Sequence, residues 1–250
     1  MNVTKSSILM KSEPSDKSSL ETECLFGETV EILEECIDWV YCRLNTDNYY
    51  GWVKKKGLGK PINVTHRVIA NRTFIHTDKN PKSKSLFYLP LGAKLLIENI
   101  QSGWAEVSLY DHETKVGYVP SNHIVCIDHK VTDWVAIAEL LVGTPYKWGG
   151  RDTIGIDCSA LLQLSYQTYG EDIPRNTSQQ IQLKKKCIKD LEDLKRGCVV
   201  FWKGHVGIMA NKSNCIHANA FHMQTKIEPL NKIVNRMGKD FNVIKMMDFN

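Results

Sequence analysis

Apolar and polar positions alternate in short runs throughout the first half of the chain. Runs rich in β-branched and aromatic residues, bounded by turn residues, predict strands. They cover residues 25–33, 39–44, 49–53, 67–74, 94–99, 104–109 and 116–119. The 3.6-residue spacing of an amphipathic helix is missing from this half. We therefore expect an all-β region.

These strands form two sets that resemble each other. Residues 27–33 align with residues 92–98, Trp39 aligns with Trp104, and residues 51–53 align with residues 117–119. A repeat of this length indicates two copies of a small β domain. The order of its elements resembles bacterial SH3-like domains, and the alternative is a single β-sandwich. We expect SH3-like barrels at residues 1–62 and 63–128.

The pattern changes after residue 128. Apolar residues at helical spacing follow Thr132, a candidate N-cap, and Gly143 ends this helix. A second predicted helix opens around Asp157 and runs to Gly170. Strands are then predicted at residues 198–202, 205–210, 214–218 and 225–229. Helices followed by an antiparallel sheet predict an α+β domain over residues 129–250.

Composition excludes several classes of protein. The chain has 250 residues, 42% of them hydrophobic, and a net charge of +4, which gives no basis for nucleic-acid binding. No secretory signal or membrane-spanning run is visible, so we expect no membrane partner. The eight cysteines form no CxxC pair. Scattered free thiols without an export signal favour the cytoplasm.

Cys158 is the candidate nucleophile. A thiol attacks as its thiolate, and the start of a helix favours the anion through unpaired backbone N–H groups. Nearby backbone N–H groups can also form an oxyanion hole. His205, at the start of a predicted strand and followed by Gly207, is the candidate base. His217, on the next strand, can orient it.

Metal binding is the rival interpretation of the same residues. Zinc held by Cys158, His205 and His217 lacks an evident fourth ligand, although His222 is available. The remaining histidines are isolated, and we interpret them as surface or turn residues: His66, His76, His112, His123 and His129. We expect no metal and no cofactor.

A set of motifs in this region resembles the NlpC-type family of bacterial cell-wall cysteine peptidases. The motifs are residues 145–151, 155–163, 174–175, 179–180, 204–209 and 216–220. The resemblance implies a papain-like core with Cys158 as nucleophile, His205 as base and His217 as orienting residue. It also implies that Tyr146 contacts the oxyanion or the substrate.

Two preceding SH3-like domains make the chain similar to the subgroup of γ-D-glutamyl-L-diamino acid endopeptidases. Those enzymes cut murein stem peptides between D-Glu and the diamino acid and require a free N-terminal L-Ala. The resemblance implies that Glu28 and Tyr49 bind the L-Ala ammonium, which Asp157 can share. It further implies that Ser159 and Thr177 bind the D-Glu carboxylate.

The sequence departs from the family pattern at three positions. Ala160 replaces a usual Gly, Asn176 a common Asp, and Cys198 a usual Asp. None of the three belongs to the predicted triad, although Asn176 lies near the predicted substrate pocket.

The predicted function is therefore recycling of imported cell-wall peptides, with L-Ala-γ-D-Glu-diamino acid as the substrate. The alternatives are a murein-lytic endopeptidase that acts on the intact wall, a non-catalytic murein-binding module, and an acyltransferase of the same fold.

Overall fold

A computed structural model describes residues 1–237 and 243–250 of the chain. It contains two compact units. The N-terminal unit comprises residues 1–129 together with residues 151–153, and the C-terminal unit comprises residues 130–150 and 154–250. In the described part of the chain no helix is long and apolar enough to span a membrane.

The N-terminal unit is all-β, as its alternating pattern predicts, and its first sheet has the strand order β3-β2-β6-β5-β4. These strands are β2 (Ser7–Lys11), β3 (Leu20–Leu25), β4 (Val30–Cys36), β5 (Trp39–Leu44) and β6 (Tyr49–Lys54). Two short strands, β1 (Asn2–Val3) and β7 (Leu58–Gly59), pair with each other. Met10, Val40 and Val53 are among the buried residues of its core.

A second set of strands in the same unit has a separate core around Ile75, Val107 and Val119. One sheet has the order β10-β9-β14-β13-β12, and a smaller one has the order β11-β8-β15. The strands are β8 (His66–Val68), β9 (Arg72–His76), β10 (Ser85–Pro90), β11 (Lys94–Leu95), β12 (Ile97–Gln101), β13 (Trp104–Leu109), β14 (Lys115–Pro120) and β15 (Ile124–Cys126). Each set has one 3₁₀ turn, Lys55–Gly57 after β6 in the first and Ser121–His123 after β14 in the second.

The two sets are built alike. Strands β5 and β13 both begin at a tryptophan, and each pairs with the following strand, β6 or β14. Gly51 and Gly117 occupy matching places in those strands. A Cβ at Gly51 would lie 2.5 Å from Met10 Cγ, and one at Gly117 would lie 2.2 Å from Ile75 Cγ2. Each glycine is therefore required by close packing inside its own core.

Residues 151–153 also belong to the N-terminal unit. Arg151–Asp152 form the short strand β16, which packs against β3. The Asp152 carboxylate accepts a hydrogen bond from the hydroxyl of Tyr88 at 2.6 Å. The Thr153 hydroxyl accepts one from Arg72 Nε at 2.8 Å. These residues fall within the domain predicted at residues 129–250, but in the structure they belong to the N-terminal unit.

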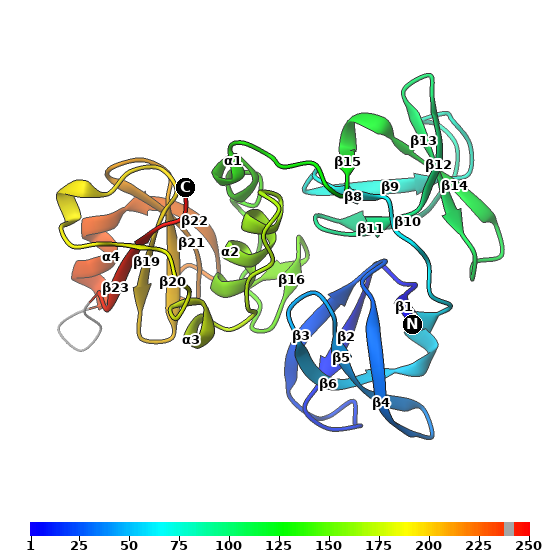
Figure 1. The fold of residues 1–250 in the computed structure, drawn as a ribbon, viewed down its shortest axis with the longest axis horizontal. Helices are drawn as coiled ribbons and strands as arrows, with labels where there is room; N and C mark the ends of the chain where they lie inside the picture. The colour runs from blue at the N-terminus through cyan, green and yellow to red at the C-terminus, as the bar shows by residue number, and fades with distance from the viewer. Residues whose placement is uncertain (238–242) are drawn as a thin grey trace. The chain divides into compact units, whose positions relative to one another are not determined.

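The C-terminal unit combines helices with a six-stranded sheet of order β18-β23-β19-β20-β21-β22. Its helices are α1 (Trp134–Glu139), α2 (Cys158–Gln167), α3 (Thr177–Gln180) and α4 (Leu230–Met237). Its strands are β17 (Gly155–Ile156), β18 (Lys186–Ile188), β19 (Cys198–Trp202), β20 (His205–Met209), β21 (Asn214–Asn219), β22 (Gln224–Pro229) and β23 (Lys245–Asp248), and Leu191–Asp193 form a 3₁₀ turn. Figure 1 shows α2 and α4 on opposite sides of the sheet.

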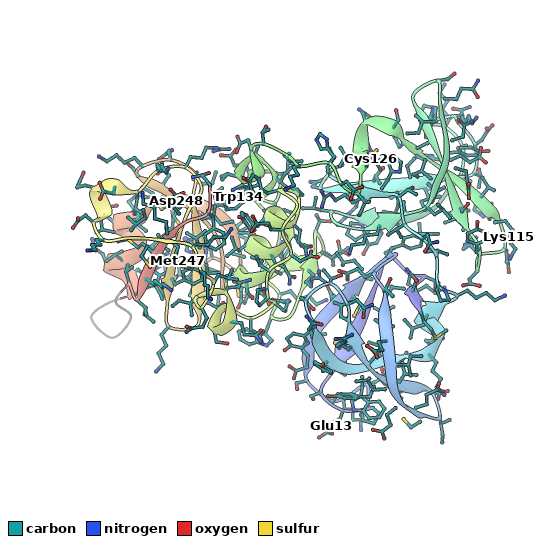
Figure 2. All side chains as sticks on the ribbon, in the orientation of Figure 1. Glu13, Lys115, Cys126, Trp134, Met247 and Asp248 are labelled. Atoms are coloured by element: carbon teal, nitrogen blue, oxygen red, sulfur yellow. The ribbon has the colours of Figure 1, made fainter. Side chains whose placement is uncertain are left out.

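Aromatic packing joins the helices of this unit to its C-terminal end. The ring of Trp134 in α1 meets that of Tyr166 in α2 edge-on, with centroids 5.2 Å apart. Phe249, which follows β23, contacts the rings of both Trp134 and Tyr166. Trp134 is labelled in Figure 2. All three side chains are almost completely buried. This cluster holds α2, whose first residue is Cys158, against the rest of the unit.

Several details of the predicted elements are wrong. The strand predicted at residues 25–33 is interrupted, because β3 ends at Leu25 and β4 begins at Val30. Strands β2 and β10 of the N-terminal unit were not predicted. Helix α1 is capped by Asp133 rather than Thr132, because the Asp133 side chain accepts a hydrogen bond from the backbone N–H of Ala136. Strands β18 and β23 and helices α3 and α4 were not predicted. Strand β23 lies between β18 and β19 in the sheet. A pairing with residues so far away in sequence leaves no local signal.

Candidate active site

Asp157 organises the start of helix α2. Its Oδ1 atom accepts a hydrogen bond from the backbone N–H of Ala160 at 2.8 Å, as expected of an N-cap. Two nitrogens of Arg175 bind the two carboxylate oxygens at 2.9 and 2.6 Å. The hydroxyl of Ser159 donates to Oδ1, and the backbone N–H of Gly149 donates to Oδ2. Asp157 is therefore a buried structural carboxylate that fixes the helix carrying Cys158.

Cys158 is the first residue of α2, and its side chain is buried. Its sulfur has hydrogen-bond partners in the backbone N–H of Val206 and the side chain of Thr177. Val206 follows His205 directly, so this contact places the thiol at the start of strand β20, beside the predicted base. The two segments are far apart in the sequence, and the fold brings them together.

The electrostatics of the thiol differ from the expectation at a helix N-terminus. Burial, followed by the charge of Asp157, raises the pKa of Cys158 to about 11. The Val206 N–H, the Arg175 charge and the Thr177 hydroxyl oppose this rise. Burial, with the charges of His217 and Arg236, also lowers the pKa of His205 to about 3. The resting site thus holds a neutral thiol and a neutral imidazole.

The two histidines meet across neighbouring strands. His205 Nε2 lies 2.8 Å from His217 Nδ1. The register of β20 with β21 pairs Ile208 with Ile216, which puts Gly207 opposite His217. A Cβ at Gly207 would lie 3.6 Å from His217 Cβ and 2.4 Å from Cys215 Sγ. The absence of a side chain at Gly207 therefore keeps room for the thiol of Cys215, on the strand that also carries His217.

A carboxylate that the sequence analysis missed completes this row. Glu228 Oε1 on β22 lies 2.7 Å from His217 Nε2. Arg236 of α4 binds both oxygens of Glu228, at 3.0 and 2.5 Å. The His222 ring approaches the same carboxylate at 3.5 Å. No local motif marks Glu228, because only the pairing of β21 with β22 brings it to His217.

Tyr146 is half-buried near the thiol. Its backbone N–H donates to the carbonyl of Met223, and the residue forms a bridge with Ile156, two positions before Cys158. Burial, then the nearby charges of Cys158 and Asp157, raise the pKa of the Tyr146 hydroxyl to about 12. The phenol keeps its proton at neutral pH and can donate a hydrogen bond.

The geometry bears on the zinc alternative. Both ring nitrogens of His217 have hydrogen-bond partners, His205 on one side and Glu228 on the other. Among residues 1–237 and 243–250 no group of three His, Cys, Asp or Glu side chains is placed to hold a metal ion. Hydrogen bonds in such a row can transfer a proton.

Comparison with known proteins identifies two kinds of domain in the chain. Residues 143–237 match the NlpC/P60 family, and residues 10–58 match the bacterial dipeptidyl-peptidase SH3 domain. The chain therefore combines an NlpC/P60 cysteine peptidase domain with a bacterial dipeptidyl-peptidase SH3 domain. The predicted papain-like α+β domain preceded by an SH3-like region is thereby confirmed.

Relatives of this NlpC/P60 peptidase align over most of its length. The gamma-D-glutamyl-L-lysine dipeptidyl-peptidase of Bacillus subtilis is 28% identical over 218 residues, which span 80% of this chain and 72% of that protein. Dipeptidyl-peptidase 6 of Lysinibacillus sphaericus is 26% identical over 244 residues, 88% of each chain. A crystal structure of an NlpC/P60 family protein from Bacillus cereus superposes with a TM-score of 0.84 over 99% of this chain and 98% of that one, at 19% identity. That structure shares the fold.

Two candidate substrate-binding residues of the peptidase lie in the N-terminal unit. Glu28 is buried, and its carboxylate accepts hydrogen bonds from Arg151 Nη1 at 2.9 Å and Nη2 at 3.0 Å. The backbone N–H of Leu25 also donates to it. The Tyr49 hydroxyl donates to Glu21 at 3.0 Å. Glu28 thus already has a cation as partner, which the sequence did not reveal.

Proposed function

We propose that this peptidase hydrolyses murein stem peptides between γ-D-Glu and the diamino acid. The names of its relatives support this substrate class, because both refer to dipeptidyl-peptidases and one specifies a γ-D-glutamyl-L-lysine bond. The observation that carries the catalytic assignment is the contact of the Cys158 sulfur with the N–H of Val206, at the head of the strand that begins with His205.

Cys158 acts as the nucleophile in the proposed mechanism. His205 accepts the thiol proton as the sulfur attacks the scissile carbonyl carbon. The resulting imidazolium then protonates the leaving amine of the diamino acid, and an acyl-enzyme remains on Cys158. Water, deprotonated by His205, attacks this thioester and releases the dipeptide. His217, 2.8 Å from His205, orients the base throughout the cycle.

The oxyanion is stabilised by hydrogen-bond donors near the start of α2. Tyr146 is one such donor, since its hydroxyl remains protonated at neutral pH. A backbone N–H in the first turn of α2 is a second, because helix-start N–H groups lack partners within the helix. We therefore assign Tyr146 an electrostatic role rather than one as acid or base.

Ser159 and Thr177 are the residues we assign to the D-Glu carboxylate. The Ser159 hydroxyl accepts a hydrogen bond from Arg175 Nη1 at 2.7 Å, so a guanidinium supplies positive charge there. Thr177 opens α3 and hydrogen-bonds the Cys158 sulfur. A carboxylate bound by these hydroxyls would lie next to the nucleophile, as the substrate requires.

A free N-terminal L-Ala is the second part of the proposal. Glu28 and Tyr49 are the residues we assign to its ammonium group, with Asp157 as the alternative. Each carboxylate is already paired with an arginine, Arg151 for Glu28 and Arg175 for Asp157. The ammonium must therefore share a carboxylate with a guanidinium, which makes replacement of Glu28 by Gln the informative test.

The test is incubation of the full chain with L-Ala-γ-D-Glu-meso-diaminopimelate and with the corresponding L-lysine peptide, with products identified by mass. We expect L-Ala-D-Glu and the free diamino acid. The Cys158→Ala variant should bind the peptide but release no dipeptide. If the unaltered chain is also inactive, a non-catalytic murein-binding module would be favoured. N-acetylation of L-Ala should reduce kcat/KM by at least 100-fold, because the acetyl group removes the charge and needs space.

We further propose that the physiological role is recycling of imported peptides in the cytoplasm. Each of the eight cysteines lies in the described part of the chain and is a free thiol, which suits a reducing compartment. Purified intact sacculi provide the discriminating substrate. Release of soluble fragments from sacculi as fast as from the tripeptide would instead favour a murein-lytic endopeptidase.

A further inference from the structure

A row of three side chains crosses adjacent strands in the C-terminal unit. His205 is on β20, His217 on β21 and Glu228 on β22. The register of β20 with β21, continued by one position, places Gly207 opposite His217, and β22 pairs Glu228 with Cys215. The three side chains therefore lie on one face of the sheet, each offset diagonally from the next. The distances are 2.8 Å between the rings and 2.7 Å from His217 to Glu228.

The carboxylate at the end of the row is held firmly in its charged form. Hydrogen bonds from Arg236 are the largest cause that lowers the pKa of Glu228 to about 2, and His217 contributes further. Arg236 is carried by α4, whose Leu230 and Ile233 are buried against Cys215 and other residues of the sheet. A deprotonated carboxylate can only accept hydrogen bonds, so His217 must present N–H at Nε2.

This constraint determines which ring nitrogen of each histidine in the row carries a proton. Burial lowers the pKa of His217, so its ring is neutral near pH 7 and carries one proton. With that proton on Nε2, Nδ1 of His217 is an acceptor and receives the Nε2–H of His205. The only lone pair left on the His205 ring is then at Nδ1, the nitrogen available to take the thiol proton.

We propose that Glu228, fixed by Arg236, is a positioning residue of the active centre that sets the tautomers of both histidines and stabilises the imidazolium formed on His205. This inference rests on the proposed catalytic roles of Cys158 and His205. When the thiol proton moves to His205 Nδ1, one positive charge appears on the ring. The negative charge of Glu228, transmitted through the His217 hydrogen bonds, offsets it.

Glu228→Gln is the decisive variant, because Gln has the same shape but no charge and can present N–H to His217. We expect kcat to fall at least roughly 10- to 100-fold with KM nearly unchanged, by analogy with loss of the carboxylate that hydrogen-bonds a metal-bound imidazole. The rate of Cys158 alkylation by iodoacetamide at pH 7 should fall by a similar factor. That readout needs no peptide, so it tests the role of Glu228 even if the proposed substrate is wrong.

Glu139→Gln is the matched control. Glu139 also pairs with an arginine, Arg196, but at the more exposed end of α1. Its replacement should leave alkylation and kcat within twofold of the unaltered chain. In a His217→Ala background, Glu228→Gln should have less than a twofold further effect, because the carboxylate acts through His217. A full effect in that background would overturn the proposal.

The unaltered protein supplies a test that needs no variant. Nitrogen-15 NMR of the histidine rings near pH 7 should show His217 protonated at Nε2 and not at Nδ1, and His205 likewise. The groups that face this row are Arg236 from α4, His222 from the turn after β21 and Lys226 opposite His217. The opposite tautomer at His217, or alkylation within twofold for Glu228→Gln, would refute the assignment.

Discussion

Replacement of Arg151 by Met should strongly destabilise the N-terminal unit. Arg151 and Glu28 have side chains that are 0% and 2% exposed. Arg151 Nη1 also donates to the backbone carbonyl of Glu23 at 2.8 Å. Burial alone would raise the pKa of Glu28, yet the charge and hydrogen bonds of Arg151 lower it below its usual value. The variant leaves a buried carboxylate that keeps the hydrogen bond from the Leu25 backbone N–H but has lost its guanidinium partner.

The expected cost is about 3 to 5 kcal/mol, the usual result of removing one member of a buried ion pair. For a chain of this size each kcal/mol lowers Tm by about 2 to 4 °C, so we expect a fall of roughly 6 to 20 °C. Arg43→Met is the matched control in the same unit. Its partner is Glu31, and the two side chains are 36% and 52% exposed, which predicts a cost of at most about 1 kcal/mol.

The measurement is urea unfolding of the full chain, followed by circular dichroism at pH 7 and pH 4. The folded-state pKa of Glu28 is depressed in the unaltered chain. The ion pair therefore stabilises the folded chain at pH values above the unfolded pKa of Glu28, and this stabilisation decreases as the pH falls. Without Arg151 the carboxylate is protonated more readily, so the difference between the chains should shrink at pH 4. Adding Glu28→Leu to Arg151→Met should recover much of the loss. A cost below about 1 kcal/mol at pH 7, equal to that of Arg43→Met, would refute this reasoning.

Other predictions concern the C-terminal unit. Cys158→Ala should abolish hydrolysis and leave the circular dichroism spectrum unchanged, and residual turnover would point to another nucleophile. His205→Ala should reduce kcat at least about 100-fold, more than His217→Ala, since water can partly replace an orienting group; the reverse order would exchange their roles. The difference absorbance at 240 nm between the unaltered chain and Cys158→Ala should show no thiolate at pH 7 and its appearance above about pH 10, because burial raises the thiol pKa to about 11. Asp157→Ala should cost about 3 kcal/mol of stability, measured by urea unfolding, because it removes both a helix cap and the partner of buried Arg175.

The amino-acid sequence by itself determined the class of the fold and predicted the residues of the candidate catalytic centre. Strand alternation and the matching positions Trp39 and Trp104 indicated the duplicated β region, because period-two patterning is a local property of each strand. The start of α2 at Cys158 was visible in the capping residue Asp157 and the apolar spacing that follows it. His205 could be selected because Gly207 leaves space beside it.

Only the tertiary structure decided which groups partner these residues. Glu228 reaches His217 through strand pairing, and Arg236 reaches Glu228 through the packing of α4, neither of which has a local signature. Arg151, seven positions before Cys158, contributes its side chain to the N-terminal unit, where it meets Glu28. The charge state of the thiol was also not predictable from the sequence. A helix start favours the thiolate, but the burial of Cys158 favours the neutral thiol more strongly. Burial and the pairing of residues far apart in the sequence depend on the whole fold. Together they determine the charge, tautomer and pKa of each group at the site.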